Sequence, residues 1–413
     1  MAGDKRRLLE NFISLGALQI VSYIIPLIAL PYQTRVLGAD KFGLIYFAYA
    51  IMGYFIILTD YGFELSATRE IAMHRHNSAN SSNIFNSVMV IKVFLLIFSY
   101  GILCLISLFI PKIHDNFIVF QLSFLMVVGN AIYPVWFFQG MERMKYITFL
   151  NILSKLIFLI SIFIFVHKEE EYVLVPLLNS LGFLISGFIG FIFAVRNFKL
   201  KLYIPKWKSI CNQFRYSSDF FLSRISVTAL GNTNTFCLGL ISSNTLVAYY
   251  VAAEKICIAI KGLQIPIKNA MYPYISKYKD VKLYKKVFFI TCFVNVFVCM
   301  VMFIFAKEFI SLFYGENLIE SYKILRIFCT IILITCPSTL LGYPLLGAMG
   351  YTKEANRSVV LASIFHIAGL GILYMLDKIS IYAIAYLVLV SETVLFLQWA
   401  YYVFKYKLLK EDC

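Results

Sequence analysis

Residues 84–109 read IFNSVMVIKVFLLIFSYGILCLISLF, and this apolar stretch decides the fold class of the chain. About 20 consecutive apolar residues are enough for one helix to cross the hydrocarbon core of a bilayer. Lys92 is the only charged residue in the stretch. The stretch therefore predicts a membrane-spanning helix that carries one buried cation.

The composition of the whole chain supports the same interpretation. Of the 413 residues, 61% are hydrophobic and 14% are charged, and the mean hydropathy is +0.80. Soluble domains are about 45–50% apolar and about 25% charged, and a globule of this length cannot bury so much apolar surface. The same values exclude a disordered chain. We therefore predict an all-α integral membrane protein.

Apolar runs separated by polar breaks predict twelve membrane-spanning helices. The expected ranges are 12–32, 43–63, 84–109, 116–138, 147–166, 173–195, 217–240, 245–270, 287–306, 323–345, 358–376 and 380–404. With the N-terminus in the cytoplasm, the loops on that side hold 23 Lys and Arg residues, against 6 on the other side. Cytoplasmic loops carry such an excess, so we expect both termini in the cytoplasm.

The longest basic break lies at the midpoint of the chain. Residues 196–216 predict a cytoplasmic linker between an N-terminal lobe, 1–195, and a C-terminal lobe, 217–413, with six helices each. Residues 37–48 and 241–252 occupy corresponding turns of the two lobes and show a weak repeat. Two like-oriented halves imply a pseudo-two-fold axis along the membrane normal, and transporters built in this way bind substrate between the halves.

Cations inside the predicted spans point to a function, because a charge near the bilayer centre costs about 2.5–3.5 kcal/mol on insertion scales. The deep cations are Lys92, Lys155, Arg224, Lys255 and Lys261. We interpret them as one water-filled cleft that binds an anionic substrate through charge-assisted hydrogen bonds. The alternative is that each cation pairs with its own acid or extends to the head groups.

Acidic residues inside the spans are fewer. Asp60, Glu254 and Glu392 are candidates either for a site of ion coupling, with H⁺ or Na⁺, or for counter-ions of the lysines. Glu254 and Lys261 are seven residues apart and therefore share one helix face. The sequence leaves both interpretations open.

Motifs for catalysis and metal binding do not occur in the sequence. The nine cysteines and five histidines have no metal-ligand spacing. There is no GxxxxGK[ST] loop for ATP hydrolysis and no convincing Ser/His/Asp arrangement. We therefore expect no enzyme, no cofactor and no metal site. We assign the net charge of +15 to cytoplasmic loops rather than to a nucleic-acid surface.

Three stretches carry a resemblance to a known family. They are LPYQTRVLG at 30–38 with Phe42-Gly43 after it, DYGF at 60–63 with ATRE at 67–70 after it, and WFFQGME at 136–142. On these stretches the chain resembles the O-antigen flippases (Wzx type) of the MOP superfamily. That superfamily also contains the MATE drug exporters and the lipid II flippase, so the resemblance implies a MATE-like fold.

The resemblance also implies a function in the cytoplasmic (inner) membrane of a Gram-negative bacterium. Such a protein moves undecaprenyl-pyrophosphate-linked oligosaccharide repeat units from the inner to the outer leaflet by alternating access. Its partners would be the lipid-linked oligosaccharide, membrane lipids and an O-antigen polymerase. Residues at motif positions would belong to loops and gates, and they are Arg35, Arg69, Glu70, Gln139 and Glu142.

Three other functions stay open. A flippase for lipid II or another lipid-linked glycan would share the fold, and a deletion strain separates it by loss of viability. A MATE-type drug or cation antiporter would need an acidic cleft, whereas this one is basic. A membrane-embedded polymerase or ligase would need a large periplasmic loop, whereas the longest expected one, about 307–322, is short.

Overall fold

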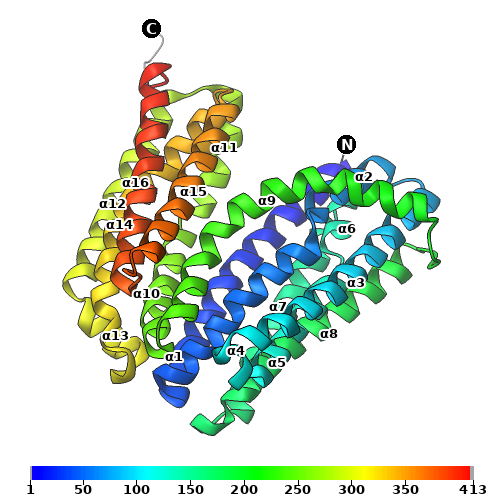
Figure 1. The fold of residues 1–413 in the computed structure, drawn as a ribbon. Coiled ribbons are helices and arrows are strands. Elements are labelled where there is room, and N and C mark those ends of the chain that lie inside the picture. The colour runs from blue at the N-terminus through cyan, green and yellow to red at the C-terminus, as the bar shows by residue number, and fades with distance from the viewer. Residues whose placement is uncertain (1, 410–413) are drawn as a thin grey trace. The chain divides into compact units, whose positions relative to one another are not determined.

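In the structure, a computed structural model, all regular secondary structure of the described residues is helical (Figure 1). It describes residues 2–409, and within them the side chains of all residues except 2–21, 23, 219 and 222–232. No β-strand occurs between residues 2 and 409. The prediction of an all-α protein is therefore confirmed for this range.

Two compact units divide the chain. The first contains Met1–Leu37 and Leu44–Thr228, and the second contains Gly38–Gly43 and Ala229–Cys413. The division falls inside a helix that begins at Trp207, so the second half of the expected linker is helical. The predicted lobe boundaries themselves stay a prediction.

The first unit is built mainly from the helices between the N-terminus and α9. These are α1 (Ala2–Asp60), α2 (Phe63–His74), α3 (Ser78–Phe109), α4 (Pro111–Asp115), α5 (Phe117–Ile132), α6 (Val135–Gly140), α7 (Met144–Phe165), the 3₁₀ turn Glu169–Val173, α8 (Leu174–Asn197) and α9 (Trp207–Ile241). Gly38 interrupts α1 with φ 69° and ψ 178°. This left-handed φ suits glycine, and it divides α1 into the two arms that the sequence predicts.

Within this unit α8 packs against both α5 and α7. Small residues allow the close approach, since a Cβ added to Gly187 would lie 2.4 Å from the carbonyl oxygen of Gly129. Ser180 fixes the same contact by donating a hydrogen bond to the carbonyl of Leu122 at 2.7 Å. On α3, by contrast, Phe94 and Phe109 are 66% and 76% exposed, as expected of side chains that face lipid.

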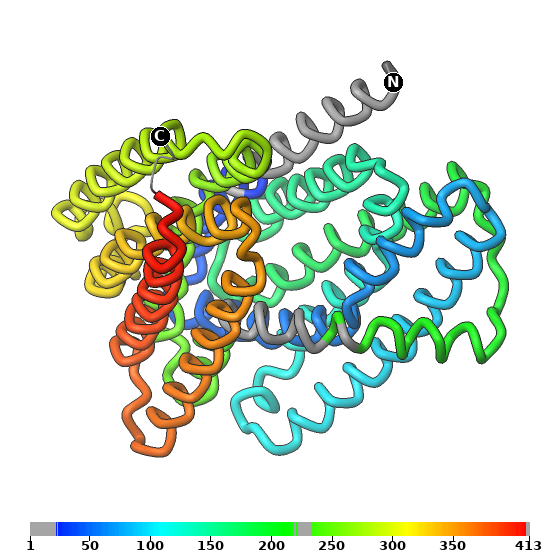
Figure 2. Tube along the Cα trace, turned by 90° about the horizontal axis from the view of Figure 1, so that it is seen from above, coloured from blue at the N-terminus to red at the C-terminus, as the bar shows by residue number. Residues whose placement is uncertain are grey.

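The second unit contains the remaining helices. These are α10 (Asn244–Gly262), α11 (Ile265–Tyr278), α12 (Val281–Ile304), α13 (Ala306–Tyr314), the 3₁₀ turn Glu316–Leu318, α14 (Ser321–Leu341), the π-helical turn Gly342–Gly347, α15 (Thr352–Met375) and α16 (Ile381–Lys405). The helix α14 packs against α10, α12 and α16, and Figure 2 shows the second unit along a perpendicular direction.

Buried polar contacts fix the packing of the second unit. Gln264 donates to Oδ1 of Asn295 at 3.2 Å, and Asn295 in turn donates to the carbonyl of Ile332 at 3.3 Å. Gly43, at the start of the second arm of α1, lies against the backbone of Asn244, where an added Cβ would come within 1.8 Å of the carbonyl oxygen. The two segments with the weak sequence repeat therefore touch each other at this glycine.

The protein is a multi-pass membrane protein. Among the described residues, nine helical segments are long and apolar enough to cross a membrane, by length and composition. Each predicted span coincides mainly with helical segments, and short breaks fall inside some of the spans, at Tyr61–Gly62, Tyr133–Pro134, Leu263–Gln264 and Phe305. The number of twelve crossings and the orientation of the termini stay predictions.

Candidate functional site

The first deep cation, Lys92, is paired. Lys92 on α3 and Asp60 at the end of the second arm of α1 form an ion pair, with 3.6 Å between Nζ and Oδ1. The two side chains are only 3% and 14% exposed. A buried ammonium group is tolerated when a carboxylate compensates its charge. The counter-ion interpretation therefore describes Asp60 here, and Lys92 does not line an open surface in this structure.

Lys155 has a different environment. It lies in the middle of α7, roughly 16 Å along the helix from Met144 at 1.5 Å per residue. Its Nζ donates a hydrogen bond to Oγ of Ser22 on α1 at 2.7 Å. Lys155 is half-buried, and it has no ion pair with any carboxylate whose side chain the structure describes. The hydroxyl satisfies one donor of the ammonium group, and it carries no negative charge that would compensate the lysine.

The second unit contains the pair of Lys261 and Glu392. Lys261 near the end of α10 and Glu392 on α16 are joined by 3.3 Å between Nζ and Oε1, with exposed fractions of 33% and 26%. Glu254 and Lys255 lie about two turns earlier on α10, and both are half-buried. The helix α10 therefore carries two cations, Lys255 and Lys261, and one acid, Glu254. The predicted fifth cation, Arg224, lies among the side chains outside the described part of the chain.

The family-like stretches 60–70 and 136–142 meet in the first unit. The helix α2 packs on α6, and Thr68 donates to the carbonyl of Trp136 at 3.0 Å. Gln139 lies between the two stretches, since it accepts from Thr68 at 3.4 Å and donates to Glu64 at 3.5 Å. These long hydrogen bonds hold Gln139 in place, so we interpret it as a positioning residue in a loop contact.

An ion pair closes the same contact. Arg75 meets Glu142 with two nitrogens, with 2.7 Å from Nη1 to Oε2 and 2.9 Å from Nη2 to Oε1. The hydrogen bond to Glu142 raises the pKa of the Arg75 guanidinium above its ordinary value. Glu142 adopts a left-handed backbone with φ 56°, which is strained for a non-glycine residue. Glu142 therefore makes a bidentate ion pair with Arg75 from a residue whose backbone conformation is unusual.

The start of α9 packs against α2 and the turn before it. Ser66 and Ser217 share a buried hydrogen bond of 2.7 Å, and Tyr61 stacks on Phe214 with ring centroids 4.3 Å apart. Gly62 has φ 77°, and an added Cβ would come within 2.8 Å of the backbone nitrogen of Phe221 on α9. The DYGF stretch therefore needs its glycine for both conformation and close approach. Arg35, beside the Gly38 kink, is separated from this cluster by roughly 33 Å of helix.

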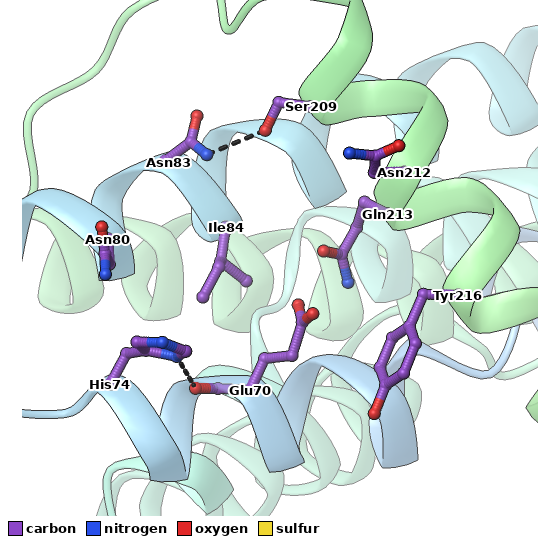
Figure 3. Close-up of a pocket in the computed structure, with 9 residues that line it drawn as sticks. All are labelled: Glu70, His74, Asn80, Asn83, Ile84, Ser209, Asn212, Gln213 and Tyr216. Carbon is purple, nitrogen blue, oxygen red and sulfur yellow. Dashed lines mark hydrogen bonds between the residues drawn. The ribbon is translucent and has the colours of Figure 1, made fainter.

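A polar pocket opens between α2, α3 and α9, with a volume of about 400 Å³ (Figure 3). Glu70, another residue of the family-like stretches, lines it together with His74, and Gln213 and Tyr216 reach it from α9. Arg69 donates to the hydroxyl of Tyr216 at 3.4 Å. Arg69 and Glu70 belong to the family-like stretches, whereas the residues of α9 in this pocket were not predicted, because residues 196–216 are typical of a basic linker.

A second group of residues missed by the sequence analysis lies within the second unit. His366 on α15 is 2% exposed. Its Nε2 donates to Oδ1 of Asn234 at 2.9 Å, and its Nδ1 lies 2.9 Å from Oγ of Ser391. Ser391 directly precedes Glu392 on α16. A single histidine in an apolar run gives no sequence signal for such a network.

Comparison with known families decides the family of the chain. The model of the polysaccharide biosynthesis protein family matches residues 8–279. The chain belongs to this family. The matched range includes all the stretches on which the sequence resemblance rests, at 30–43, 60–70 and 136–142.

Two curated relatives match this chain over almost their whole length. A protein of Escherichia coli K12 named "Putative O-antigen transporter" is 29% identical over 374 residues, which cover 88% of this chain and 89% of the relative. A protein of Shigella dysenteriae with the same name is 27% identical over 366 residues, covering 88% and 91%. The relatives are named as transporters and not as enzymes.

Solved structures show the fold of this family member. The lipid II flippase MurJ in an inward closed conformation matches with a TM-score of 0.72 at 16% identity, over 97% of this chain and 87% of that chain. A MATE multidrug transporter of the MOP superfamily matches with a TM-score of 0.69 at 13% identity, over 97% and 99%. The predicted MATE-like fold class is therefore confirmed.

Proposed function

We propose that this protein is a flippase that moves undecaprenyl-pyrophosphate-linked O-antigen repeat units from the cytoplasmic to the periplasmic leaflet of a bacterial inner membrane. The observation that carries the proposal is the match over 88% of the chain to relatives named as O-antigen transporters. The flippase fold of a structural neighbour supports the same class of substrate. An O-antigen polymerase is the partner that would consume the delivered unit.

The charges inside the helices support an anionic head group. A pyrophosphate needs cations, and it gains most from those that no carboxylate already compensates. Lys155 has a serine hydroxyl as its partner, at 2.7 Å, and we assign it the first place in head-group binding. Lys255 and Arg224 also belong to the proposed set, because they are cations within apolar helices. The burial of Lys92 at 3% exposure, by contrast, assigns that lysine to the ion pair with Asp60.

We further propose that the pair of Lys261 and Glu392 exchanges partners during transport. A diphosphate that reaches Lys261 competes with Glu392 for the same ammonium group. The released carboxylate then takes up a coupling ion, H⁺ or Na⁺. Such a competition makes substrate affinity differ between states, and only a difference in affinity can shift a conformational equilibrium.

Alternating access fits the chemistry of this substrate. The polar sugars and diphosphate need a wet path, because charged groups in hydrocarbon are costly. The polyprenyl tail can stay in the bilayer during the passage. In this proposal the N-terminal lobe, 1–195, and the C-terminal lobe, 217–413, are the moving bodies, with both termini in the cytoplasm.

A deletion strain of the source organism tests the proposal. We expect loss of surface O-antigen, accumulation of the lipid-linked unit and full recovery with the wild-type gene. The Lys155→Glu variant should insert normally and fail to restore O-antigen, whereas the matched control Lys168→Glu, at an exposed position, should restore it. Loss of viability without loss of O-antigen would instead indicate lipid II as the substrate. Drug sensitivity alone would indicate an antiporter.

A further inference from the structure

A cationic pocket lies within the second unit, where α12 ends and where α14 and α16 begin. The helices α12 and α16 both pack against α14 (Figure 1), and the pocket between the three has a volume of about 440 Å³. Arg326 and Lys323 line it from α14, and none of its described lining residues is a carboxylate. Neither Lys261 nor Glu392 lines this pocket, so it is separate from their ion pair.

The guanidinium group of Arg326 is fixed by contacts that leave most of its donors available. Its Nε donates a hydrogen bond to the carbonyl of Phe303 on α12 at 3.2 Å. Its Cζ lies 5.4 Å from the ring centroid of Phe303 and 5.3 Å from that of Tyr322, which are cation–π distances. No described carboxylate forms an ion pair with Arg326. The two Nη groups, with four of the five N–H donors of the side chain, can therefore bind a ligand.

The second cation of the pocket already has a counter-ion. Nζ of Lys323 lies 2.5 Å from Oε2 of Glu320, and the two side chains are 44% and 46% exposed. The positive charge that a ligand can use is therefore that of Arg326. The planar fork of an arginine matches two oxygens of a phosphate group. The charge and the geometry together indicate an anion of this class.

The rest of the pocket changes from polar to apolar along the helices. Arg326 lies roughly 7.5 Å from the start of α14, and Tyr382 and Tyr386 lie in the first two turns of α16. Tyrosine is typical of the interface between bilayer and water. Leu389, seven residues beyond Tyr382, and Ile327 form an apolar wall deeper in the pocket. A lipid has the same order, with a phosphate at the interface and a hydrocarbon chain below it.

The pocket also lies beside surface that faces lipid. On α12 the apolar side chains Phe297 and Met300 are 61% and 57% exposed, and on α16 Tyr386 is 54% exposed. In the predicted orientation, this end of the three helices is periplasmic. A lipid that enters from the bilayer can therefore reach Arg326 without leaving the interface.

We propose that this pocket binds the phosphate group of a membrane lipid, with Arg326 as the phosphate ligand and Leu389 in contact with the hydrocarbon chain. Basic pockets between membrane helices bind anionic lipid head groups. Two kinds of lipid carry this chemistry, an anionic phospholipid of the bilayer and a polyprenyl diphosphate. The inference does not depend on the proposed transport function, and the test separates the two lipids.

The test measures lipid binding to the full-length protein in detergent by native mass spectrometry. The probe is dioleoyl phosphatidylglycerol, and the titration gives the Kd of the tightest site. Arg326→Gln should weaken this site about tenfold or more, because the bidentate charge-assisted contact is lost. The matched control is Arg357→Gln, which changes an exposed arginine of α15 outside the pocket. We expect this control to bind the lipid as the wild type does.

A second variant keeps Arg326 and its hydrogen bond to Phe303. Leu389→Trp fills the apolar wall of the pocket and should also weaken binding about tenfold. Its control is Val390→Trp, at the next position of α16, which is 47% exposed and does not line the pocket. The Tm of every variant is measured alongside. Should Arg326→Gln fail to fold, Leu389→Trp and its control decide the result.

Undecaprenyl diphosphate is the competing probe. Displacement of phosphatidylglycerol by an equal concentration of it would identify the polyprenyl lipid as the preferred ligand, and persistence of the phospholipid would identify the phospholipid. Both results support the site, provided that binding depends on Arg326. Absence of binding to the wild type, or wild-type affinity in folded Arg326→Gln or in Leu389→Trp, would overturn the inference. Equal losses in the two control variants would do the same. Export of O-antigen is measured separately and tests only the proposed function.

Discussion

Lys261 and Glu392 are 131 residues apart in the sequence, and their side chains meet with 3.3 Å between Nζ and Oε1. The pair joins α10 to α16 within the second unit, and both side chains are about a quarter to a third exposed. An ion pair that is neither fully buried nor fully solvated can open without a prohibitive cost. This property is what an exchange of partners during transport requires.

Reversal of this pair tests its role. Lys261→Glu alone places two carboxylates together and should abolish O-antigen export, and Glu392→Lys should do the same. The double variant restores the attraction and should regain Tm, because each single change costs about 1–3 kcal/mol at this exposure. Export by the double variant should stay low if Lys261 contacts the substrate. Full export by the double variant would reduce the pair to a structural role.

The pair of Lys92 and Asp60 should behave as a structural ion pair. Asp60→Asn removes the carboxylate that faces the buried ammonium group of Lys92 and should destabilise the protein by about 3–5 kcal/mol, seen as a lower Tm in nanodiscs. Lys92→Met combined with Asp60→Leu removes both charges and should recover most of that loss. A double variant less stable than both single variants would contradict this assignment.

Glu142 combines an ion pair with a strained backbone. Glu142→Ala removes the ion pair with Arg75, and an exposed ion pair contributes about 0.2–1 kcal/mol to the free energy of unfolding. The alanine still has to adopt the positive φ. Glu142→Gly also loses the pair but relieves a strain of about 1–2 kcal/mol. We therefore expect Glu142→Gly to have the higher Tm of the two variants. Equal Tm values would show that the conformation at Glu142 carries no strain.

His366 offers a test of the buried network in the second unit. His366→Leu leaves Oδ1 of Asn234 without its donor and should cost about 1–3 kcal/mol of stability. The matched control His114→Leu changes a histidine whose side chain is 68% exposed, and its Tm should stay near the wild-type value. Unfolding curves of the two variants in the same nanodiscs provide the comparison, and similar losses in both would argue against the network.

The sequence predicts the helices better than it predicts their contacts. The stretch 84–109 is long and apolar enough to predict a membrane-spanning helix, and α3 extends from Ser78 to Phe109 in the structure. The length of an apolar run is a local property of the sequence, so it predicts a membrane-spanning helix without knowledge of the fold. The apolar pattern did not predict the break at Tyr133–Pro134 or the early start of α9 at Trp207. Both depend on local turns and packing.

The sequence predicts which charged residues lie inside the helices, but it does not predict which of them form ion pairs with each other. Lys92 and Lys261 stand out because cations are rare in apolar runs. Which acid meets each lysine depends on helix packing over 32 and 131 residues, which hydropathy does not encode. Gln213 and His366 gave no signal at all, since a glutamine in a basic stretch and a lone histidine are ordinary until the fold places their partners beside them.

The most direct test of the central claim follows the lipid-linked unit across the membrane. Spheroplasts of the deletion strain, with and without the gene, are treated with a membrane-impermeant reagent that modifies exposed sugars. With the protein present, the lipid-linked repeat units should become accessible at the periplasmic face, and without it they should accumulate in protected form. Equal accessibility in the two strains would contradict the proposal that this protein is the flippase.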